Sequence, residues 1–291
     1  MRYEGVIYRP PSEAHSLLIQ ATIGCPHNKC TFCAMYKEVK FRLRSVEDIK
    51  ADLKEAEQRY GRAIPNIFFP DGNTIIMKTD QLAEIFTYSH QLFPHLQRIT
   101  LYGAARFITK KSMEDLIRLK AAGLSRIHMG MESGDDVTLQ QLQKGSTAEM
   151  IIDAGTKVKK AGIDLSMYYL VGAGGLERTR EHAEESARVV SAIRPDFLRL
   201  RTLVPVPNTP LWDQYQRGEF SLLSPHQALR EIYILVKNLE ANGTQVLSDH
   251  VSNYWNVEGI IPADREHMLA EIDRALTIDE SRFRSPLISQ L

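Results

Sequence analysis

The sequence lacks any charge excess and any long apolar run. The chain has 36 basic residues (lysine and arginine) and 36 acidic residues (aspartate and glutamate), so the formal net charge is zero. A neutral chain has no overall field to attract a polynucleotide, which weighs against nucleic acid as a partner. No apolar run approaches the roughly 20 residues that cross a bilayer, and the first residues lack the apolar core of a secretory signal. We therefore expect no membrane partner and a cytoplasmic location.

Cysteine is also scarce, since the chain has only three, and all lie in one short stretch as Cys25, Cys30 and Cys33. Three thiols on one loop suit an iron–sulfur cluster or zinc, and their spacing does not suit a disulfide framework. Both kinds of metal site usually take four protein ligands. Either another residue such as His27 completes the site, or one metal position is left open for a ligand.

The rest of the chain alternates short apolar runs with amphipathic stretches. Expected strands cover residues 16–22, 66–69, 98–102, 126–131, 164–171 and 197–204, and expected helices cover 45–60, 79–92, 112–122, 136–143, 147–161 and 179–193. Strand-then-helix units in series predict parallel strands with right-handed crossovers. The fold class is therefore α/β, with the sheet either open or curled into a barrel.

After residue 210 this alternation breaks. Helical patterns cover residues 211–218, 225–241 and 263–276, with a possible strand over 244–247. We predict three parts: an N-terminal extension over 1–15, a core over 16–211, and a mostly helical C-terminal appendage over 212–291.

Glycine and polar residues collect just after the expected strands. Asp71, Gly72 and Asn73 follow the second strand, and Glu132 and Ser133 follow the fourth. Binding sites of parallel α/β folds lie at the carboxyl ends of the strands. The cysteines also follow a strand, so we expect them on the same face.

A cysteine triplet after the first strand of such a chain resembles the radical S-adenosylmethionine (radical SAM) superfamily, and the resemblance covers residues 17–211. It implies a partial (β/α)6 barrel of the TIM type. In that family three cysteines hold a [4Fe–4S] cluster, whose fourth iron binds S-adenosylmethionine. Reductive cleavage releases a 5′-deoxyadenosyl radical that abstracts hydrogen from the substrate. The resemblance implies Cys25, Cys30 and Cys33 as cluster ligands, and a flavodoxin- or ferredoxin-type electron donor as partner.

The resemblance also assigns cofactor contacts. Phe32 matches the aromatic position that packs near the adenine. Asp71, Gly72 and Asn73 stand at the turn that meets the methionine amino group. Residues 130–133 resemble the Gly-x-(Gln/Glu)-Ser signature of the branch with anaerobic coproporphyrinogen oxidases, methylthiotransferases and Elp3-like enzymes, which would put Glu132 and Ser133 beside the ribose or the methionine end.

Two later segments extend the match. Gly172 and Gly174 lie in a turn that resembles the one approaching the adenine, after which Arg178 or Arg180 would meet the methionine carboxylate. Val204 begins a segment resembling Pro-x-Pro-Gly-Thr-Pro, with Asn208 where glycine is usual. Asparagine tolerates a positive φ better than most residues, so we expect the turn to survive.

The cluster sequence departs from the family in one respect. Four residues separate Cys25 from Cys30, where three are usual. No further cysteine remains for an auxiliary cluster, which favours a single-cluster reaction on a small or medium-sized substrate. The alternatives are a non-catalytic iron–sulfur or zinc protein, such as an electron carrier or cofactor chaperone, and a radical SAM methyltransferase or tRNA-modifying enzyme.

Two arginines in the sixth expected strand stand apart from these motifs. Arg199 and Arg201 alternate along the strand and so share a face. Charges inside a parallel strand are unusual. They either bind an anionic substrate or pair with a carboxylate at a strand end, and the sequence leaves both interpretations open.

Overall fold

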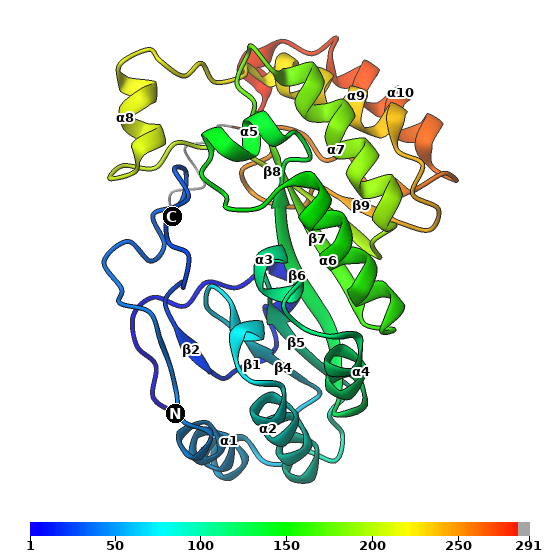
Figure 1. The fold of residues 1–291 in the computed structure, drawn as a ribbon. Coiled ribbons are helices and arrows are strands. Elements are labelled where there is room, and N and C mark those ends of the chain that lie inside the picture. Colours follow the sequence, from blue (N-terminus) through cyan, green and yellow to red (C-terminus); the bar gives the residue numbers. More distant parts are fainter. Residues whose placement is uncertain (285–291) are drawn as a thin grey trace. The chain divides into compact units, whose positions relative to one another are not determined.

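The structure, a computed structural model, describes residues 1–284 and is drawn in Figure 1; the last residues of the predicted appendage, 285–291, lie outside the described part. The fold is α/β with a mostly parallel sheet of eight strands, which confirms the predicted class. The strands are β1 Leu17–Leu18, β2 Thr22–Ile23, β3 Arg42–Leu43, β4 Asn66–Phe69, β5 Arg98–Tyr102, β6 Leu124–Glu132, β7 Asp164–Val171, β8 Phe197–Thr202, β9 Gln245–Leu247 and β10 Gly259–Ile260.

The helices follow the strands in the alternating order that the sequence predicts. They are α1 Val46–Tyr60, α2 Thr79–Leu92, α3 Ala105–Ile108, α4 Met113–Ala121, α5 Asp136–Gln141, α6 Ala148–Lys160, α7 Thr179–Ile193, α8 Pro210–Gln216, α9 Pro225–Asn238 and α10 Arg265–Ala275. Three short 3₁₀ turns, η1 Pro11–Glu13, η2 Thr74–Ile76 and η3 Glu280–Arg282, complete the described elements. No helix within residues 1–284 combines the length and apolar character needed to cross a membrane.

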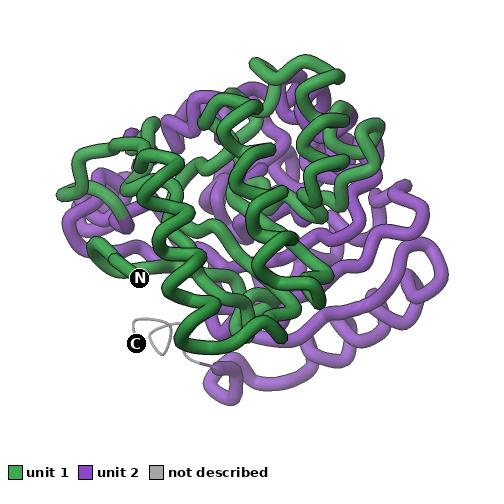
Figure 2. The backbone as a smooth tube through the Cα atoms, turned by 90° about the horizontal axis from the view of Figure 1, so that it is seen from below, with its two compact units in different colours: residues 1–28, 36–129, 157–165 green, residues 29–35, 130–156, 166–291 purple. Residues whose placement is uncertain are grey.

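The chain divides into two compact units, which Figure 2 distinguishes by colour. Unit 1 consists of residues 1–28, 36–129 and 157–165. In it β1, β4, β5 and β6 are parallel neighbours, while β2 and β3 form a separate antiparallel pair. Helix α2 packs against α1 and α4.

Unit 2 consists of residues 29–35, 130–156 and 166–291. Here β7, β8 and β9 are parallel, and β10 closes the series as an antiparallel strand. Helix α9 packs against α7 and α10. Strands β6 and β7 each contribute residues to both units.

Burial explains why the parallel strands could be read from sequence. Every residue of β7 from Leu165 to Val171 is buried, because helices and loops cover both faces of a parallel strand. The bounds of β7 and of α7 are those that the pattern predicts. Helix α4 begins after Ser112, which forms a reciprocal capping box with Asp115.

One expectation needs correction. The strand expected over 16–22 is wrong as one element, because Ile19, Gln20 and Ala21 interrupt it between β1 and β2, which pair with different strands. In the C-terminal part, the possible strand over 244–247 is confirmed as β9, and it continues the parallel series beside β8.

Candidate functional site

The first cysteine is held against the turn that follows β4. The Gly72 amide donates to the Gly24 carbonyl at 3.1 Å. A Cβ added to Gly72 would lie 2.6 Å from the Cys25 Cβ and 2.8 Å from its Cα. Such distances are too short for carbon atoms in van der Waals contact. Glycine is therefore required here so that the turn can close on Cys25.

The polar side chains of this turn are used to fix it. Asp71 is 1% exposed, has φ of 71°, and accepts hydrogen bonds from Gln20 Nε2 at 2.9 Å and from the Tyr36 hydroxyl at 3.3 Å. Burial raises the pKa of Asp71 to about 6, although those hydrogen bonds act to lower it. Asn73 Oδ1 accepts from the Ala104 amide at 2.5 Å. These contacts leave the backbone of the turn as the part that can meet a ligand.

The second half of the cysteine loop is anchored within unit 2. The Thr31 amide donates to the Leu142 carbonyl at 2.9 Å, and the Thr31 carbonyl accepts from the Leu211 amide at 3.0 Å. Phe32 packs against an apolar cluster formed by Leu142, Leu170, Ala173, Leu203 and Leu211. Phe32 therefore shares a surface with the turn after β7 and with the segment that begins at Val204.

A partly buried cation is influenced by the charges of the second and third cysteines. Lys144 Nζ is 2.8 Å from Glu132 Oε1, and their side chains are only 13% and 14% exposed. The same ammonium is 6.0 Å from the centre of the Phe32 ring. Burial acts to lower the pKa of Lys144, but the charges of Glu132 and of the Cys30 and Cys33 thiolates raise it. Lys144 therefore stays protonated and offsets negative charge near these thiols.

The three cysteines are half-buried thiols, which suits ligands that must meet an incoming group. As they are placed, no three His, Cys, Asp or Glu side chains within residues 1–284 come together as a metal site. His27 Nδ1 lies 2.5 Å from Arg106 Nη1, so this nitrogen already has a partner. The chemistry of the donor set fits an iron–sulfur cluster, because all three candidate ligands are thiols. Within unit 2 the charges of Cys30 and Cys33 act on Lys144, and within unit 1 the Gly72 turn closes on Cys25.

Ser133 belongs to a buried hydrogen-bonded chain that runs through His182. His182 Nε2 lies 3.1 Å from the Leu170 carbonyl and must donate to it. His182 Nδ1 therefore accepts from the Ser133 hydroxyl, 2.7 Å away. Burial lowers the pKa of His182 to about 4, which keeps the ring neutral at neutral pH.

The turn after β7 is held by a buried carboxyl group. Glu231 Oε1 accepts from the Gly172 amide and from the Tyr169 hydroxyl, both at 2.8 Å. The Tyr169 ring stacks on His182 with 4.6 Å between ring centres. Burial raises the pKa of Glu231 to about 8, so this carboxyl group is mostly protonated at neutral pH. Glu231 thus holds the Gly172 turn, and His182 holds the Ser133 side chain.

Arg178 and Gly174 also serve to hold this region together. Arg178 donates from Nε and Nη2 to the two oxygens of Asp135, each at 2.9 Å. Burial acts to raise the pKa of Asp135, but the Arg178 and Thr138 hydrogen bonds lower it to about 2. A Cβ on Gly174 would lie 2.9 Å from the Arg178 carbonyl oxygen. Arg180 is exposed and pairs with Glu184 at 2.8 Å.

The sequence patterns did not single out Lys144, His182 or Glu231. Lys144 lies within residues 139–145, which continue the pattern of the related branch. Glu231 stands on the buried face of α9 with Ala228 and Leu235, and an acidic residue on an apolar stripe was the available signal. His182 carried no such signal, because its partners come from distant segments.

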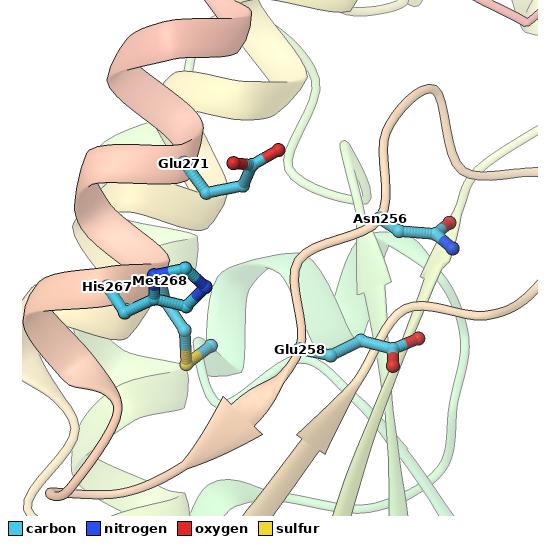
Figure 3. Close-up of a pocket in the computed structure, with 5 residues that line it drawn as sticks. All are labelled: Asn256, Glu258, His267, Met268 and Glu271. Carbon is cyan, nitrogen blue, oxygen red and sulfur yellow. The ribbon is translucent and has the colours of Figure 1, made fainter.

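The structure also has a surface hollow away from these residues. Asn256, Glu258, His267, Met268 and Glu271 line it, with the last three projecting from α10 (Figure 3). None of the predicted site residues lines this hollow.

The parallel sheet, the strand-end turns and the cysteine loop define a radical SAM type of α/β protein. Residues 19–190 match the family described as the Radical SAM superfamily. That match covers more than half of the chain, and the chain belongs to this superfamily. Its members generally bind a [4Fe–4S] cluster and S-adenosylmethionine.

Several relatives share this core at low identity. An uncharacterized protein of Methanocaldococcus jannaschii is 24% identical over 229 residues, covering 75% of this chain and 69% of that protein. A tRNA-2-methylthio-N(6)-dimethylallyladenosine synthase of Dehalococcoides mccartyi is 23% identical over 69% of this chain and 48% of its own length. The heme chaperone HemW of Bacillus subtilis is 19% identical over 67% and 54%. The chain thus spans about half of the latter two relatives.

A solved structure shows the same fold. The coproporphyrinogen III oxidase HemN from Escherichia coli superposes with a TM-score of 0.56 at 17% identity, over 84% of this chain and 64% of that one. This supports the expected partial barrel of the TIM type. The relationship to the branch named from residues 130–133 is likewise confirmed.

Proposed function

We propose that this protein is a radical SAM enzyme whose Cys25, Cys30 and Cys33 hold a [4Fe–4S] cluster. It cleaves S-adenosylmethionine reductively, and hydrogen is then abstracted from a small or medium-sized substrate. When bound, the cluster supplies the electron for that cleavage. The observation that carries the proposal is the partly buried Lys144 near Cys30 and Cys33, because such a cation offsets the charge of a thiolate-bound cluster.

The surrounding residues are assigned to positioning the cofactor. The Gly72 turn offers backbone groups next to Cys25 for the methionine amino group. Phe32, Gly172, Gly174 and Val204 border the adenine, since Phe32 packs on the cluster that contains Ala173 and Leu203. We assign Glu132 to the ribose or methionine end through its pair with Lys144.

Arg178 is assigned an indirect role. Because its Nε and Nη2 nitrogens both donate to the carboxylate of Asp135, we assign it to holding the start of α5 rather than to meeting the methionine carboxylate itself. Ser133 likewise acts through His182. The enzyme also requires a reduced electron donor, of flavodoxin or ferredoxin type.

The test is anaerobic reconstitution with iron and sulfide, followed by dithionite and S-adenosylmethionine. The wild-type chain should turn brown and release 5′-deoxyadenosine and methionine. Cys30→Ala should lose the colour and reduce product below detection, because it removes one of three cluster ligands. Lys29→Ala, at an exposed position of the same loop, is the control and should retain both. Undiminished cleavage by Cys30→Ala would show that the ligands are misassigned.

A cofactor chaperone is the second candidate, favoured by the similarity to heme chaperone HemW. Such a protein would bind heme tightly and release little 5′-deoxyadenosine. Heme titration alongside the cleavage assay separates the two functions. Stoichiometric zinc without iron–sulfur absorption would exclude the enzyme and favour a zinc protein.

A further inference from the structure

Arg199 and Arg201 lie on one face of β8, in unit 2. Neither arginine is among the residues assigned to the cofactor. The two arginines alternate with Leu198 and Leu200, which are buried on the opposite face. In the parallel register Arg199 lies beside Tyr168 of β7 and Leu247 of β9, and Arg201 lies beside Leu170. Two guanidinium groups are therefore presented side by side from one strand.

These guanidinium groups have too few acceptors. Arg199 is 7% exposed, and its one ion pair is with Asp249, at 3.4 Å. Within residues 1–284, Arg201 has neither a hydrogen bond nor an ion pair through its side chain, and the buried Nε atoms of both arginines have no acceptor. Guanidinium does not lose its proton in proteins. One positive charge therefore remains unbalanced among Arg199, Arg201 and Asp249.

Hydrogen bonds hold the neighbouring loop in place. Residues 248–253, directly after β9, are joined to β8 by two side chain–backbone hydrogen bonds. Asn253 Nδ2 donates to the Leu200 carbonyl at 2.8 Å, and Ser252 Oγ accepts from the Thr202 amide at 3.1 Å. Asn253 Nδ2 also donates to the Ser248 carbonyl at 2.9 Å, which closes the loop on itself. This loop fixes Asp249 near Arg199.

The ion pair of Asp249 is with Arg199, and within residues 1–284 this loop forms no ion pair with Arg201. The loop places His250 near Arg201. Burial is the main cause that lowers the pKa of His250 to about 4, and the charge of Arg201 is the second cause. His250 is therefore neutral at neutral pH and does not compensate the guanidinium.

We propose that Arg199 and Arg201 bind an anionic group of the substrate, a carboxylate or a phosphate. Arg201 is partly buried, and a partly buried charge without a counter-charge is unfavourable unless a ligand supplies one. The planar fork of arginine matches both groups with two parallel hydrogen bonds. Asp249 orients Arg199, while Arg201 provides the open fork. The substrate assignment rests on the proposed function, because the anion must belong to the molecule that loses hydrogen.

The test is equilibrium dialysis of the full-length reconstituted chain against labelled inorganic phosphate, succinate or S-adenosylmethionine at constant ionic strength. Wild-type protein should bind one of the two small anions saturably at one site. Arg201→Gln should weaken that binding by about 10- to 100-fold, which is the range for a lost charge-assisted hydrogen-bonded pair. Arg201→Lys keeps the charge without the fork and should fall between. Arg188→Gln, an exposed arginine paired with Glu185, should match wild type.

Thermal unfolding supplies an independent readout. Without anion, Arg201→Gln should melt above the wild-type chain, because it removes a partly buried charge that has no partner. Added phosphate or succinate should raise the wild-type midpoint and leave that of Arg201→Gln unchanged. The proposal would be overturned if Arg201→Gln melted lower than wild type and still bound the small anion as tightly. It would also be overturned if Arg201→Gln lost S-adenosylmethionine binding and kept small-anion binding.

The outcomes separate this inference from the proposed function. A wild-type chain that releases 5′-deoxyadenosine and binds neither phosphate nor succinate leaves the enzyme in place and rejects the anion site. A chain that binds a small anion through Arg201 and releases no 5′-deoxyadenosine keeps the anion site and rejects the enzyme.

Discussion

At the scale of single residues, the site depends on polar groups that burial has made neutral. Glu231 is fully buried on α9, and its Oε2 atom has no hydrogen-bond partner in the part of the chain that the structure describes. A carboxylate in such a place would carry the whole desolvation cost of its charge, so it holds a proton instead. The neutral acid can still accept the bonds that fix Gly172 and Tyr169. Glu231 is thus a positioning residue for the turn after β7.

This neutrality predicts a pH dependence of stability. The pKa of Glu231 is about 8 in the folded chain, whereas a glutamate in an unfolded chain titrates near 4.5, so the folded state binds the proton more tightly. Stability is therefore fully present below about pH 4.5 and is lost as pH rises toward 8, at up to about 1.4 kcal/mol per pH unit. Glu231→Gln should flatten this slope in urea unfolding between pH 5 and 9, and exceed wild type in stability above pH 8.

The control is Glu240→Gln, an exposed acid just beyond the same helix, which should keep the wild-type slope. An unchanged slope in Glu231→Gln would mean that this carboxyl group is ionised in the folded protein. The amide retains an oxygen for Gly172 and Tyr169, so loss of the turn is not expected to obscure the comparison.

At the scale of elements, the turn after β4 and the start of the cysteine loop, up to Asn28, form one packed pair within unit 1. The turn can approach Cys25 because residue 72 has no side chain. The approach distance is the reason, since φ of Gly72 is not positive, unlike that of its neighbour Asp71. Geometry of the backbone at this turn therefore sets the position of one predicted cluster ligand.

Gly72→Ala is expected to displace the cysteine loop without unfolding the chain. Its new methyl would meet Cys25 at 2.6 Å, so either the turn or the loop must move. We expect iron content after reconstitution to fall at least about threefold, while the far-ultraviolet circular dichroism stays native. Gly218→Ala is the control, because its methyl meets nothing within 4 Å and costs only the strain of a positive φ, about 1–2 kcal/mol. Equal iron in both variants would contradict the packing argument.

The element scale also shows what the sequence could and could not predict. Strand β7 was predictable from its continuous apolar run, and helix α7 was predictable from its long helical periodicity. Asn208 does adopt φ of 65°, as its tolerance of that region predicts. The pairs of Lys144 with Glu132 and of Ser133 with His182 were not predictable, because they join residues 12 and 49 positions apart. Periodicity describes faces, and partners across the fold need coordinates.

At the scale of the whole molecule, the superfamily was predictable from the order of weak motifs along the chain, and it is confirmed by the match over residues 19–190. The reaction was not, because the fold is shared by proteins of several functions. The relatives include a tRNA-modifying synthase and a heme chaperone. What distinguishes this chain must then lie in its own charge distribution and in residues such as Arg199 and Arg201.

That charge distribution gives a prediction about nucleic acid. Proteins that bind tRNA gain affinity by releasing counterions from phosphates, which requires an excess of lysine and arginine on the contacting surface. This chain balances 36 basic against 36 acidic residues, and many of its arginines pair with acids, as Arg217 does with Glu219. We therefore expect no mobility shift of bulk tRNA at about 150 mM salt with micromolar protein.

A known tRNA-binding protein is the positive control for this prediction. A shift that weakens steeply between about 50 and 200 mM salt would instead indicate several phosphate contacts, and the substrate would then be sought among tRNAs, with the arginines of β8 facing a phosphate.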